Sequence, residues 1–126
     1  MALQFYKCKK CGKVVAMLKG SPCETVCCGE DMVALQANTT DAAVEKHVPV
    51  VQQDGNLVTG FVGSVAHPME EKHFIEWLAI ETKGSSQLRF LKPGAAPKAA
   101  FALTDGDELV RAYAYCNLHG LWADRK

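Results

Sequence analysis

The sequence predicts a mainly β protein in which a small cysteine-rich, metal-binding segment precedes an antiparallel β-sandwich. Five of the six cysteines fall within residues 8–28, and so short a segment has too few apolar residues to fold without a staple. From residue 47 onward, six or seven short apolar runs alternate with turn residues, and no long helical pattern occurs. That alternation is typical of a sandwich. We therefore expect two domains, residues 1–36 and 37–126, with residues 37–46 as a linker.

The overall composition argues for a soluble protein without a nucleic-acid or membrane partner. Fourteen basic and fourteen acidic residues balance to a formal net charge of zero, which argues against binding to a polyanion. No apolar run approaches the roughly 20 residues that span a bilayer. The first residues lack the apolar stretch of a secretory signal. We expect a cytoplasmic protein.

The N-terminal segment is expected to form two short hairpin-like passes. A first strand is predicted at residues 3–7 and a second in the apolar run 14–18, followed by turn residues at 20–22. Residues 27–29 end the second pass, and residues 32–35 add a last strand. A bound metal is the expected source of stability for this domain.

Four of the cysteines predict a metal site rather than disulfides. They form a Cys-x-x-Cys pair and an adjacent pair: Cys8, Cys11, Cys27 and Cys28. Adjacent cysteines are poorly placed to bridge each other, and the lack of a secretory signal indicates a reducing compartment. Four thiolates suit tetrahedral zinc and a single iron about equally. Cys23 lies outside the pattern, and we interpret it as a small apolar filler or a free surface thiol.

The second domain is predicted strand by strand from its apolar runs and turns. A helical turn is possible from Thr40 or Asp41, and Pro49 marks a strand start or an edge strand. Residues 54–56 are a strong hairpin turn signal. The run 74–81 is apolar on both faces and is expected to be central. The expected strands are residues 48–52, 57–65, 74–81, 87–91, 99–103 and 109–115.

All four histidines and Cys116 are expected to converge on one metal ion. Cys116 and His119 lie three positions apart, close enough to bind the same ion. His47, His67 and His73 each lie at an expected loop–strand junction, where side chains from different strands can meet at one end of a sandwich. Four imidazoles and one thiolate leave one position of an octahedron open, and this donor set suits iron.

Other metal proteins fit these residues less well. A blue-copper carrier also joins a β-sandwich to a C-terminal Cys and His, but it needs an axial Met or an equivalent soon afterwards. Here Gly-Leu-Trp-Ala follows His119. No Cys-x-x-Cys-His run occurs, so c-type haem attachment is excluded. A structural zinc protein remains open, although it would leave the histidines and Cys116 without a role.

Taken together, these motifs resemble those of desulfoferrodoxins, the two-iron form of superoxide reductase, over essentially the whole chain. The four N-terminal cysteines are similar to a rubredoxin-like, desulforedoxin-type centre. Three further segments match the family in order: Glu45 to Val50, Gly63 to His73, and Cys116 to Gly120. Four ordered motifs in one chain are a specific signal, whereas Cys-x-x-Cys alone is a weak one.

The resemblance implies two mononuclear irons per chain. One is held by Cys8, Cys11, Cys27 and Cys28, and the other by His47, His67, His73 and His119 in a plane, with Cys116 as the axial ligand. It also implies a rubredoxin/desulforedoxin-like first domain, an immunoglobulin-like sandwich and a homodimer. The implied activity is one-electron reduction of superoxide to hydrogen peroxide, with rubredoxin or a similar donor supplying the electron. Such an activity detoxifies reactive oxygen.

Two residues beside His47 are candidates for catalysis. Superoxide is a small anion, so a cation beside the open metal position would raise its encounter rate even on a neutral protein. Lys46 is that candidate, and an exposed, solvated lysine is the alternative interpretation. The resemblance implies that Glu45 binds the oxidised iron once peroxide has left; without the resemblance it would be an ordinary surface carboxylate.

Overall fold

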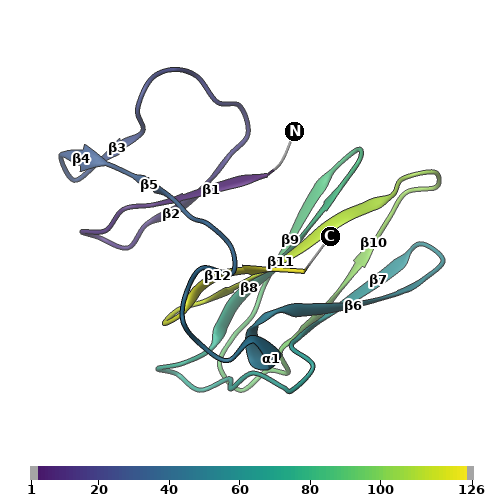
Figure 1. Ribbon diagram of the computed structural model, residues 1–126. Helices are drawn as coiled ribbons and strands as arrows, with labels where there is room; N and C mark the ends of the chain where they lie inside the picture. The colour runs from purple at the N-terminus through teal and green to yellow at the C-terminus, as the bar shows by residue number, and fades with distance from the viewer. Residues whose placement is uncertain (1–2, 125–126) are drawn as a thin grey trace. The chain divides into compact units, whose positions relative to one another are not determined.

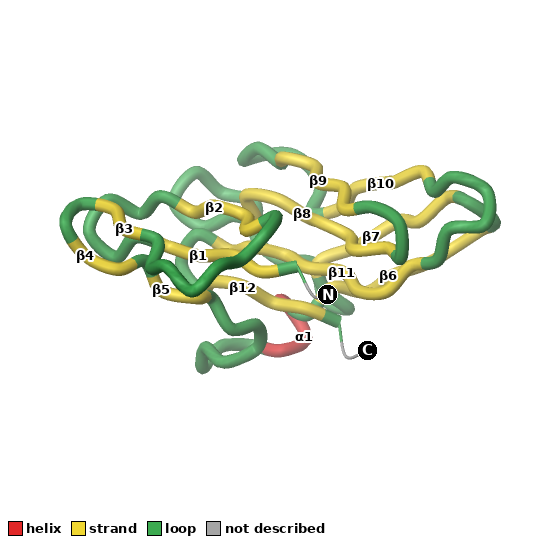
Figure 2. Tube along the Cα trace, turned by 90° about the horizontal axis from the view of Figure 1, so that it is seen from above, coloured by secondary structure: helices red, strands yellow, loops and turns green. Residues whose placement is uncertain are grey.

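The computed structural model describes residues 3–124 of the chain. It divides into two compact units, Met1–Gln36 and Ala37–Lys126, and each is described separately below. Figure 1 labels the elements of both units. Strands predominate throughout, and α1 (Val44–His47) is the helix marked in red in Figure 2. No helix in residues 3–124 is long and apolar enough to cross a membrane.

The first unit consists of two very small antiparallel sheets. One has the order β2-β1-β5, built from β1 (Gln4–Lys7), β2 (Val14–Met17) and β5 (Val33–Ala34). The other pairs β3 (Val26–Cys27) with β4 (Glu30–Asp31). Its buried apolar side chains in the described residues are Phe5, Cys8 and Met32. Three side chains make too small a core for an independent fold, which agrees with a bound metal as its main support.

The second unit is a β-sandwich of two antiparallel sheets. The three-stranded sheet has the order β10-β7-β6, and the four-stranded sheet has the order β12-β11-β8-β9. Their strands are β6 (Pro49–Asp54), β7 (Leu57–Val62), β8 (Ile75–Thr82), β9 (Ser86–Phe90), β10 (Lys98–Ala102), β11 (Leu109–Cys116) and β12 (Gly120–Ala123). The mainly β prediction, with an antiparallel sandwich as its larger part, is confirmed.

The core of the sandwich lies between the two sheets. The three-stranded sheet contributes Val58, Val62 and Phe101, which are at most 1% exposed. From the facing sheet come alternate residues of β8 and β11: Leu78, Ile80, Ala112, Ala114 and Cys116. This alternation follows from the period of two in a strand. Cys116 is therefore the last core residue of β11, and its sulfur lies where the core meets one end of the sandwich.

Most of the predicted strands agree with the structure to within a residue or two. Pro49 opens β6, an edge strand, and the apolar run around Trp77 forms β8, which pairs with β11 on one side and β9 on the other. The strand predicted at 57–65 is too long, because β7 ends at Val62 and the chain turns there. The helical turn predicted from Thr40 or Asp41 begins later, at Val44. The last strand, β12, was not predicted.

Candidate metal centres

The first candidate centre joins the four paired cysteines of the N-terminal unit. The ligand atoms of Cys8, Cys11, Cys27 and Cys28 all lie within 4.8 Å of one another. The sulfurs of Cys11 and Cys27 are 3.7 Å apart, and those of Cys27 and Cys28 are 3.9 Å apart. A tetrahedral ion with bonds of about 2.3 Å to sulfur separates its ligands by about 3.8 Å. The spacing therefore fits one four-coordinate ion.

A tight turn places the first two of these sulfurs. The Gly12 N–H donates to the Cys8 carbonyl at 2.9 Å, and the Cys8 N–H donates to the Lys13 carbonyl at 2.9 Å. Gly12 has a φ of 82°, a conformation that glycine adopts without steric cost. The turn also aims the Cys11 N–H at the Cys8 sulfur, 3.4 Å away. The backbone thereby offers a hydrogen bond to a thiolate.

The protonation of this cysteine set suits a cation. The backbone hydrogen bond from Cys11 is the main reason that the pKa of Cys8 falls to about 6. By contrast, the hydrogen bond with Cys11 is the main reason that the pKa of Cys28 rises to about 12. The first thiol of the set thus ionises readily, while full deprotonation needs positive charge to balance it. A bound metal supplies that charge.

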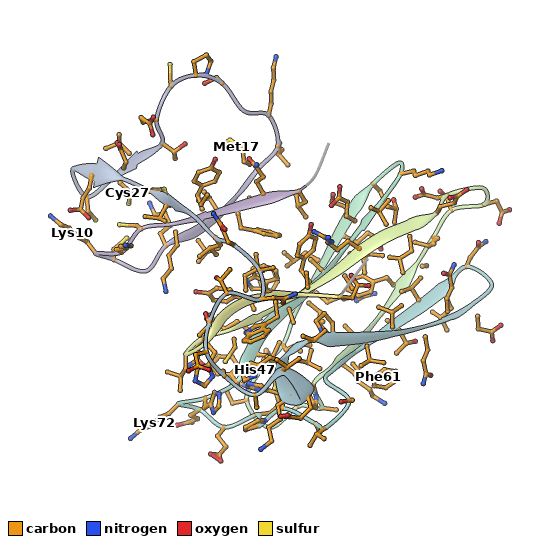
Figure 3. All side chains as sticks on the ribbon, in the orientation of Figure 1. Lys10, Met17, Cys27, His47, Phe61 and Lys72 are labelled. Carbon is orange, nitrogen blue, oxygen red and sulfur yellow. The ribbon has the colours of Figure 1, made fainter. Side chains whose placement is uncertain are left out.

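The second candidate centre lies at one end of the sandwich, where α1 and the inter-strand loops meet (Figure 1). His47 is the last residue of α1 and is labelled at this end in Figure 3. His67 belongs to the segment between β7 and β8, and His73 immediately precedes Phe74 and β8. Cys116 ends β11, and His119 lies in the turn that leads to β12. Five side chains from four parts of the chain are thus brought to one place.

The geometry of this centre is compact. The ligand atoms of His47, His67, His73 and Cys116 lie within 4.8 Å of one another. His119 borders this group: its Nδ1 is 3.1 Å from His47 Nε2 and 3.9 Å from the Cys116 sulfur. The Nε2 atoms of His47 and His67 are 3.2 Å apart. The rings of His73 and His119 meet edge to face, with centroids 5.2 Å apart and planes inclined by 80°.

The tautomers of two histidines leave their lone pairs facing one another. His47 Nδ1 lies 2.7 Å from the Ala43 carbonyl, and His67 Nδ1 lies 2.6 Å from the Pro68 carbonyl. A carbonyl only accepts, so both Nδ1 atoms carry the proton and both Nε2 atoms are bare in the neutral rings. Two bare nitrogens 3.2 Å apart repel each other unless a cation lies between them. The arrangement is that of metal ligands whose outer nitrogens are fixed by the backbone.

Burial favours the neutral forms of His47, His67, His73 and Cys116. Desolvation lowers the pKa of His47 and His73, and it lowers that of His67 to about 4. His73 Nε2 is buried without a hydrogen-bond partner, which is uncommon for a buried polar atom. Desolvation raises the pKa of the Cys116 thiol, although the backbone N–H groups of Leu118 and His119 act in the opposite direction. A metal ion would satisfy the orphaned nitrogen and deprotonate the thiol.

The spacing of the nitrogens fits a single ion. Donors about 2.1 Å from a metal and at right angles to each other are about 3.0 Å apart. The two measured nitrogen separations, 3.1 and 3.2 Å, are close to that value. Imidazole nitrogens together with one thiolate form a donor set that suits iron, copper or zinc. The residues present therefore fit a resident mononuclear metal.

The two candidate catalytic residues lie on α1, next to His47. The side chains of Glu45 and Lys46 are exposed. Lys46 is close enough to the centre that its charge contributes to lowering the pKa of His73. The charge of Glu45 acts in the opposite sense on His47. Both side chains are thus exposed to solvent next to the buried His47.

Gly63, which lies in a tight contact with α1, was not singled out from the sequence. A Cβ added there would lie 2.6 Å from the Glu45 carbonyl oxygen, 3.0 Å from that of Val48 and 3.1 Å from the Lys46 carbonyl carbon. The next residues bind α1 directly, since Ser64 Oγ and the Val65 N–H both donate to the Glu45 carbonyl at 3.2 and 2.9 Å. The absence of a side chain at Gly63 lets the His67 loop and α1 meet. The sequence signal for this contact was limited to the Gly63-Ser64 pair at the start of that segment.

The chain is mainly β, with a four-sulfur site in its small unit and a nitrogen-rich site at one end of its sandwich. These features define a metalloprotein with two mononuclear centres. The chain belongs to the desulfoferrodoxin family. The model of the family, described as desulfoferrodoxin, matches residues 39–125. The model of the desulfoferrodoxin N-terminal domain matches residues 1–35.

Individual relatives agree with this assignment. A desulfoferrodoxin from Syntrophotalea carbinolica is 50% identical over 121 residues, covering 96% of this chain and 94% of the relative. The crystal structure of the superoxide reductase from Treponema pallidum has a TM-score of 0.84 at 38% identity, covering 99% of this chain and 100% of that one. A superoxide reductase from Giardia intestinalis has a TM-score of 0.56 at 35% identity, covering 64% of this chain and 95% of that one.

Proposed function

We propose that this protein is a superoxide reductase that converts superoxide to hydrogen peroxide at the centre formed by His47, His67, His73, His119 and Cys116. The observation that carries the proposal is the pair of bare Nε2 atoms, 3.2 Å apart, beside a buried sulfur and an orphaned His73 nitrogen. Family membership and two solved superoxide reductases of similar structure support it.

Iron bound by these donors would supply the one electron that superoxide needs, and the thiolate of Cys116 would increase the electron density available for that transfer. The chain's contribution is to hold the donors. The Ala43 and Pro68 carbonyls fix the rings of His47 and His67 through their Nδ1–H groups. Burial of Cys116, which is 0% exposed, keeps water from the sulfur. Such fixed, water-excluded donors need little reorganisation during turnover.

Lys46 is proposed to attract superoxide and to help deliver protons. Reduction of superoxide to hydrogen peroxide consumes one electron and two protons, so the substrate is an anion and the reaction needs an acid nearby. Lys46 is exposed and adjoins His47 in sequence, and its positive charge contributes to lowering the pKa of His73. A cation at the mouth of a site raises the rate of encounter with an anion. The same group, or water hydrogen-bonded to it, can donate a proton.

Glu45 is proposed to bind at the centre after peroxide has left. Its backbone is held by two hydrogen bonds from the Gly63–His67 segment, through Ser64 and Val65. Its carboxylate is exposed on the same turn as Lys46. A fixed backbone with an exposed carboxylate is suited to a ligand that associates only in one stage of the cycle.

The four-cysteine centre is proposed to hold a second iron, and a rubredoxin-like protein is proposed as the electron donor. The sulfur spacing near 3.8 Å supports a four-coordinate ion, and the family match to residues 1–35 favours iron over zinc. We further propose a homodimer located in the cytoplasm, on the resemblance to the family.

Metal analysis combined with an oxidised-minus-reduced visible spectrum tests the proposal. Two irons per chain and a coloured oxidised protein are expected. Zinc at both centres and a colourless protein would contradict it. Iron at the cysteine centre with zinc at the histidine centre would leave an electron carrier and would refute the proposed reductase.

A further inference from the structure

Asn117 stands between two proposed ligands, Cys116 and His119, yet the proposed function gives it no part. Its side chain and backbone make three hydrogen bonds to a distant segment. Asn117 Oδ1 accepts from the Phe74 N–H at 3.0 Å, and Nδ2 donates to the Lys72 carbonyl at 3.0 Å. The Asn117 N–H donates to the Phe74 carbonyl at 3.2 Å. These bonds cross more than forty positions of sequence and end on the two neighbours of His73.

His73 is held differently from His47 and His67. The rings of His47 and His67 are each oriented by an Nδ1–H bond to a backbone carbonyl. Within residues 3–124, neither ring nitrogen of His73 bonds to a backbone carbonyl and its buried Nε2 has no hydrogen-bond partner, so the aim of the ring depends on the backbone that carries it. That backbone is fixed on one side by the paired hydrogen bonds between Glu70 and His73, 2.9 and 3.0 Å long. The amide of Asn117 fixes it on the other side.

We propose that Asn117 is a positioning residue that aims His73 at the metal and keeps it in register with Cys116 and His119. The amide group suits this task because it offers an acceptor and a donor at once, one for the Phe74 N–H and one for the Lys72 carbonyl. The same residue thus binds the His73 segment to the turn that carries two other donors. The inference rests on the proposed function in so far as His73 is a metal ligand.

The expected effect follows from the behaviour of groups that orient metal ligands. Loss of such a group typically weakens metal affinity by about 10- to 100-fold. Asn117→Ala removes both side-chain hydrogen bonds while leaving every donor atom in the chain. Asn117→Asp keeps an acceptor for the Phe74 N–H, but it replaces the donor to the Lys72 carbonyl with a second acceptor and adds a negative charge. Both variants are expected to bind iron more weakly than the natural protein.

Asn38 provides a matched control. Its Nδ2 donates to the Ala123 carbonyl at 3.1 Å, and its Oδ1 accepts from the Ala123 N–H at 3.0 Å. Asn38→Ala therefore also removes an amide that makes two backbone hydrogen bonds across a long sequence separation, but neither residue is a proposed ligand. It is expected to lower the free energy of unfolding of the metal-free protein and to weaken iron binding at the histidine centre much less than Asn117→Ala does, because Ala123 adjoins Trp122 rather than a ligand.

The test is a double-mutant cycle in the full-length protein, which measures the affinity for ferrous iron by competition with a chelator. Mössbauer spectroscopy of the iron-loaded protein assigns each change to the nitrogen-ligated or the four-sulfur centre. Asn117→Ala should weaken the first centre in the natural background and have little further effect when combined with His73→Ala. If Asn117→Ala does not fold, Asn117→Asp takes its place in the cycle.

Four results would each overturn part of the proposal. An undiminished affinity in Asn117→Ala, or the same loss in Asn38→Ala, would overturn the positioning role. So would a loss that persists in full when His73 is already absent, since Asn117 would then act through general stability. Full iron affinity in His73→Ala alone would instead overturn the proposed ligand set, and with it the proposed function.

Discussion

The indole ring of Trp122 stacks on the imidazole of His47, with ring centroids 4.8 Å apart and planes inclined by 27°. Its Nε1–H donates to the carbonyl of His119 at 3.1 Å. Trp122 is only 1% exposed, and it packs between the His47 ring and the His119 backbone. Trp122 thus contacts the ring of His47 and the backbone of His119, two proposed ligands from opposite ends of the second unit's sequence.

The first prediction concerns Trp122. Trp122→Phe keeps an aromatic ring against His47 but leaves the His119 carbonyl without its donor, and we expect a loss of about 1 kcal/mol in the free energy of unfolding. Trp122→Ala also opens a cavity and should cost about 3–5 kcal/mol. Denaturant titration measures both losses, and chelator competition measures the accompanying loss of iron.

Trp77→Phe is the matched control, because Trp77 is also buried but stacks on Tyr115, with centroids 5.4 Å apart. It should change stability without loosening iron at the histidine centre. Equal iron loss in both Trp→Phe variants would mean that Trp122 acts only through general packing.

The second prediction concerns the close approach at Gly63. Gly63→Ala would place a Cβ 2.6 Å from the Glu45 carbonyl, so α1 must move and carry Lys46 and His47 with it. We expect a loss of about 1–3 kcal/mol in the free energy of unfolding and slower reaction with superoxide. In Gly60→Ala, within β7 and three residues before Gly63, the nearest atom to the new Cβ is Leu78 Cδ2 at 3.8 Å. This control should keep its activity, and equal rates for the two variants would contradict the interpretation.

The third prediction concerns Lys46. Lys46→Ala should slow the second-order reaction with superoxide roughly tenfold and reduce its dependence on salt, because an attractive charge has been removed. Pulse radiolysis at several ionic strengths measures both quantities. Lys83→Ala removes the same charge from an exposed lysine paired with Glu108, and it should have little effect. A rate for Lys46→Ala that matches the natural protein at all salt concentrations would exclude the proposed role.

The fourth prediction concerns Cys116. Serine provides no thiolate, so Cys116→Ser should lose the sulfur-to-iron charge-transfer absorption of the histidine centre. Absorption from the four-cysteine centre should remain, which makes that centre an internal control. An oxidised spectrum identical to that of the natural protein would exclude Cys116 as a ligand.

The fifth prediction is a pH dependence of stability remote from both centres. Thr82 Oγ1 donates to Asp107 Oδ2 at 2.6 Å, and the N–H groups of Gly84 and Glu108 donate to Oδ1 at 3.0 and 2.9 Å. The hydrogen bond from Thr82 is the main reason that the pKa of Asp107 is lowered from its ordinary value of 3.8. A carboxyl with a depressed pKa stabilises the fold above its unfolded pKa, and this contribution is lost as the pH falls below that value.

Asp107→Asn should therefore be less stable than the natural protein at neutral pH, and the difference should shrink as the pH falls below about 4. Urea titrations at a series of pH values measure it, and the comparison between the two proteins cancels any loss of metal. Asp54→Asn, at the β6–β7 turn, serves as the control. A stability difference for Asp107→Asn that is constant with pH would refute the prediction.

The residues that carry a local signal were predictable from the sequence. Strands such as β8 and β11 follow from apolar runs bounded by turns, and Pro49 fixed the start of β6 because proline lacks a ladder donor. The cysteine pairs were grouped correctly as a set whose sulfurs lie within 4.8 Å. In each case the evidence lies within a few neighbouring residues.

The features that depend on tertiary contacts were not predictable in the same way. Gly63 matters because of carbonyls on α1, and Trp122 matters because its ring reaches His47. The short strand β12 was missed because the run after His119 was assigned only to the ligand motif, and its pairing with β11 defines it. The helix α1 begins three residues after Asp41, because its position depends on hydrogen bonds with the Gly63–His67 segment rather than on a capping side chain.

The most direct test of the account is the product yield of the fully reduced, two-iron protein mixed with less than one equivalent of superoxide. A reductase should yield one hydrogen peroxide for each superoxide consumed and release no oxygen, with oxidation of the protein in step. Half as much peroxide, accompanied by oxygen and an unchanged redox state of the protein, would show dismutation and would contradict the proposed reductase.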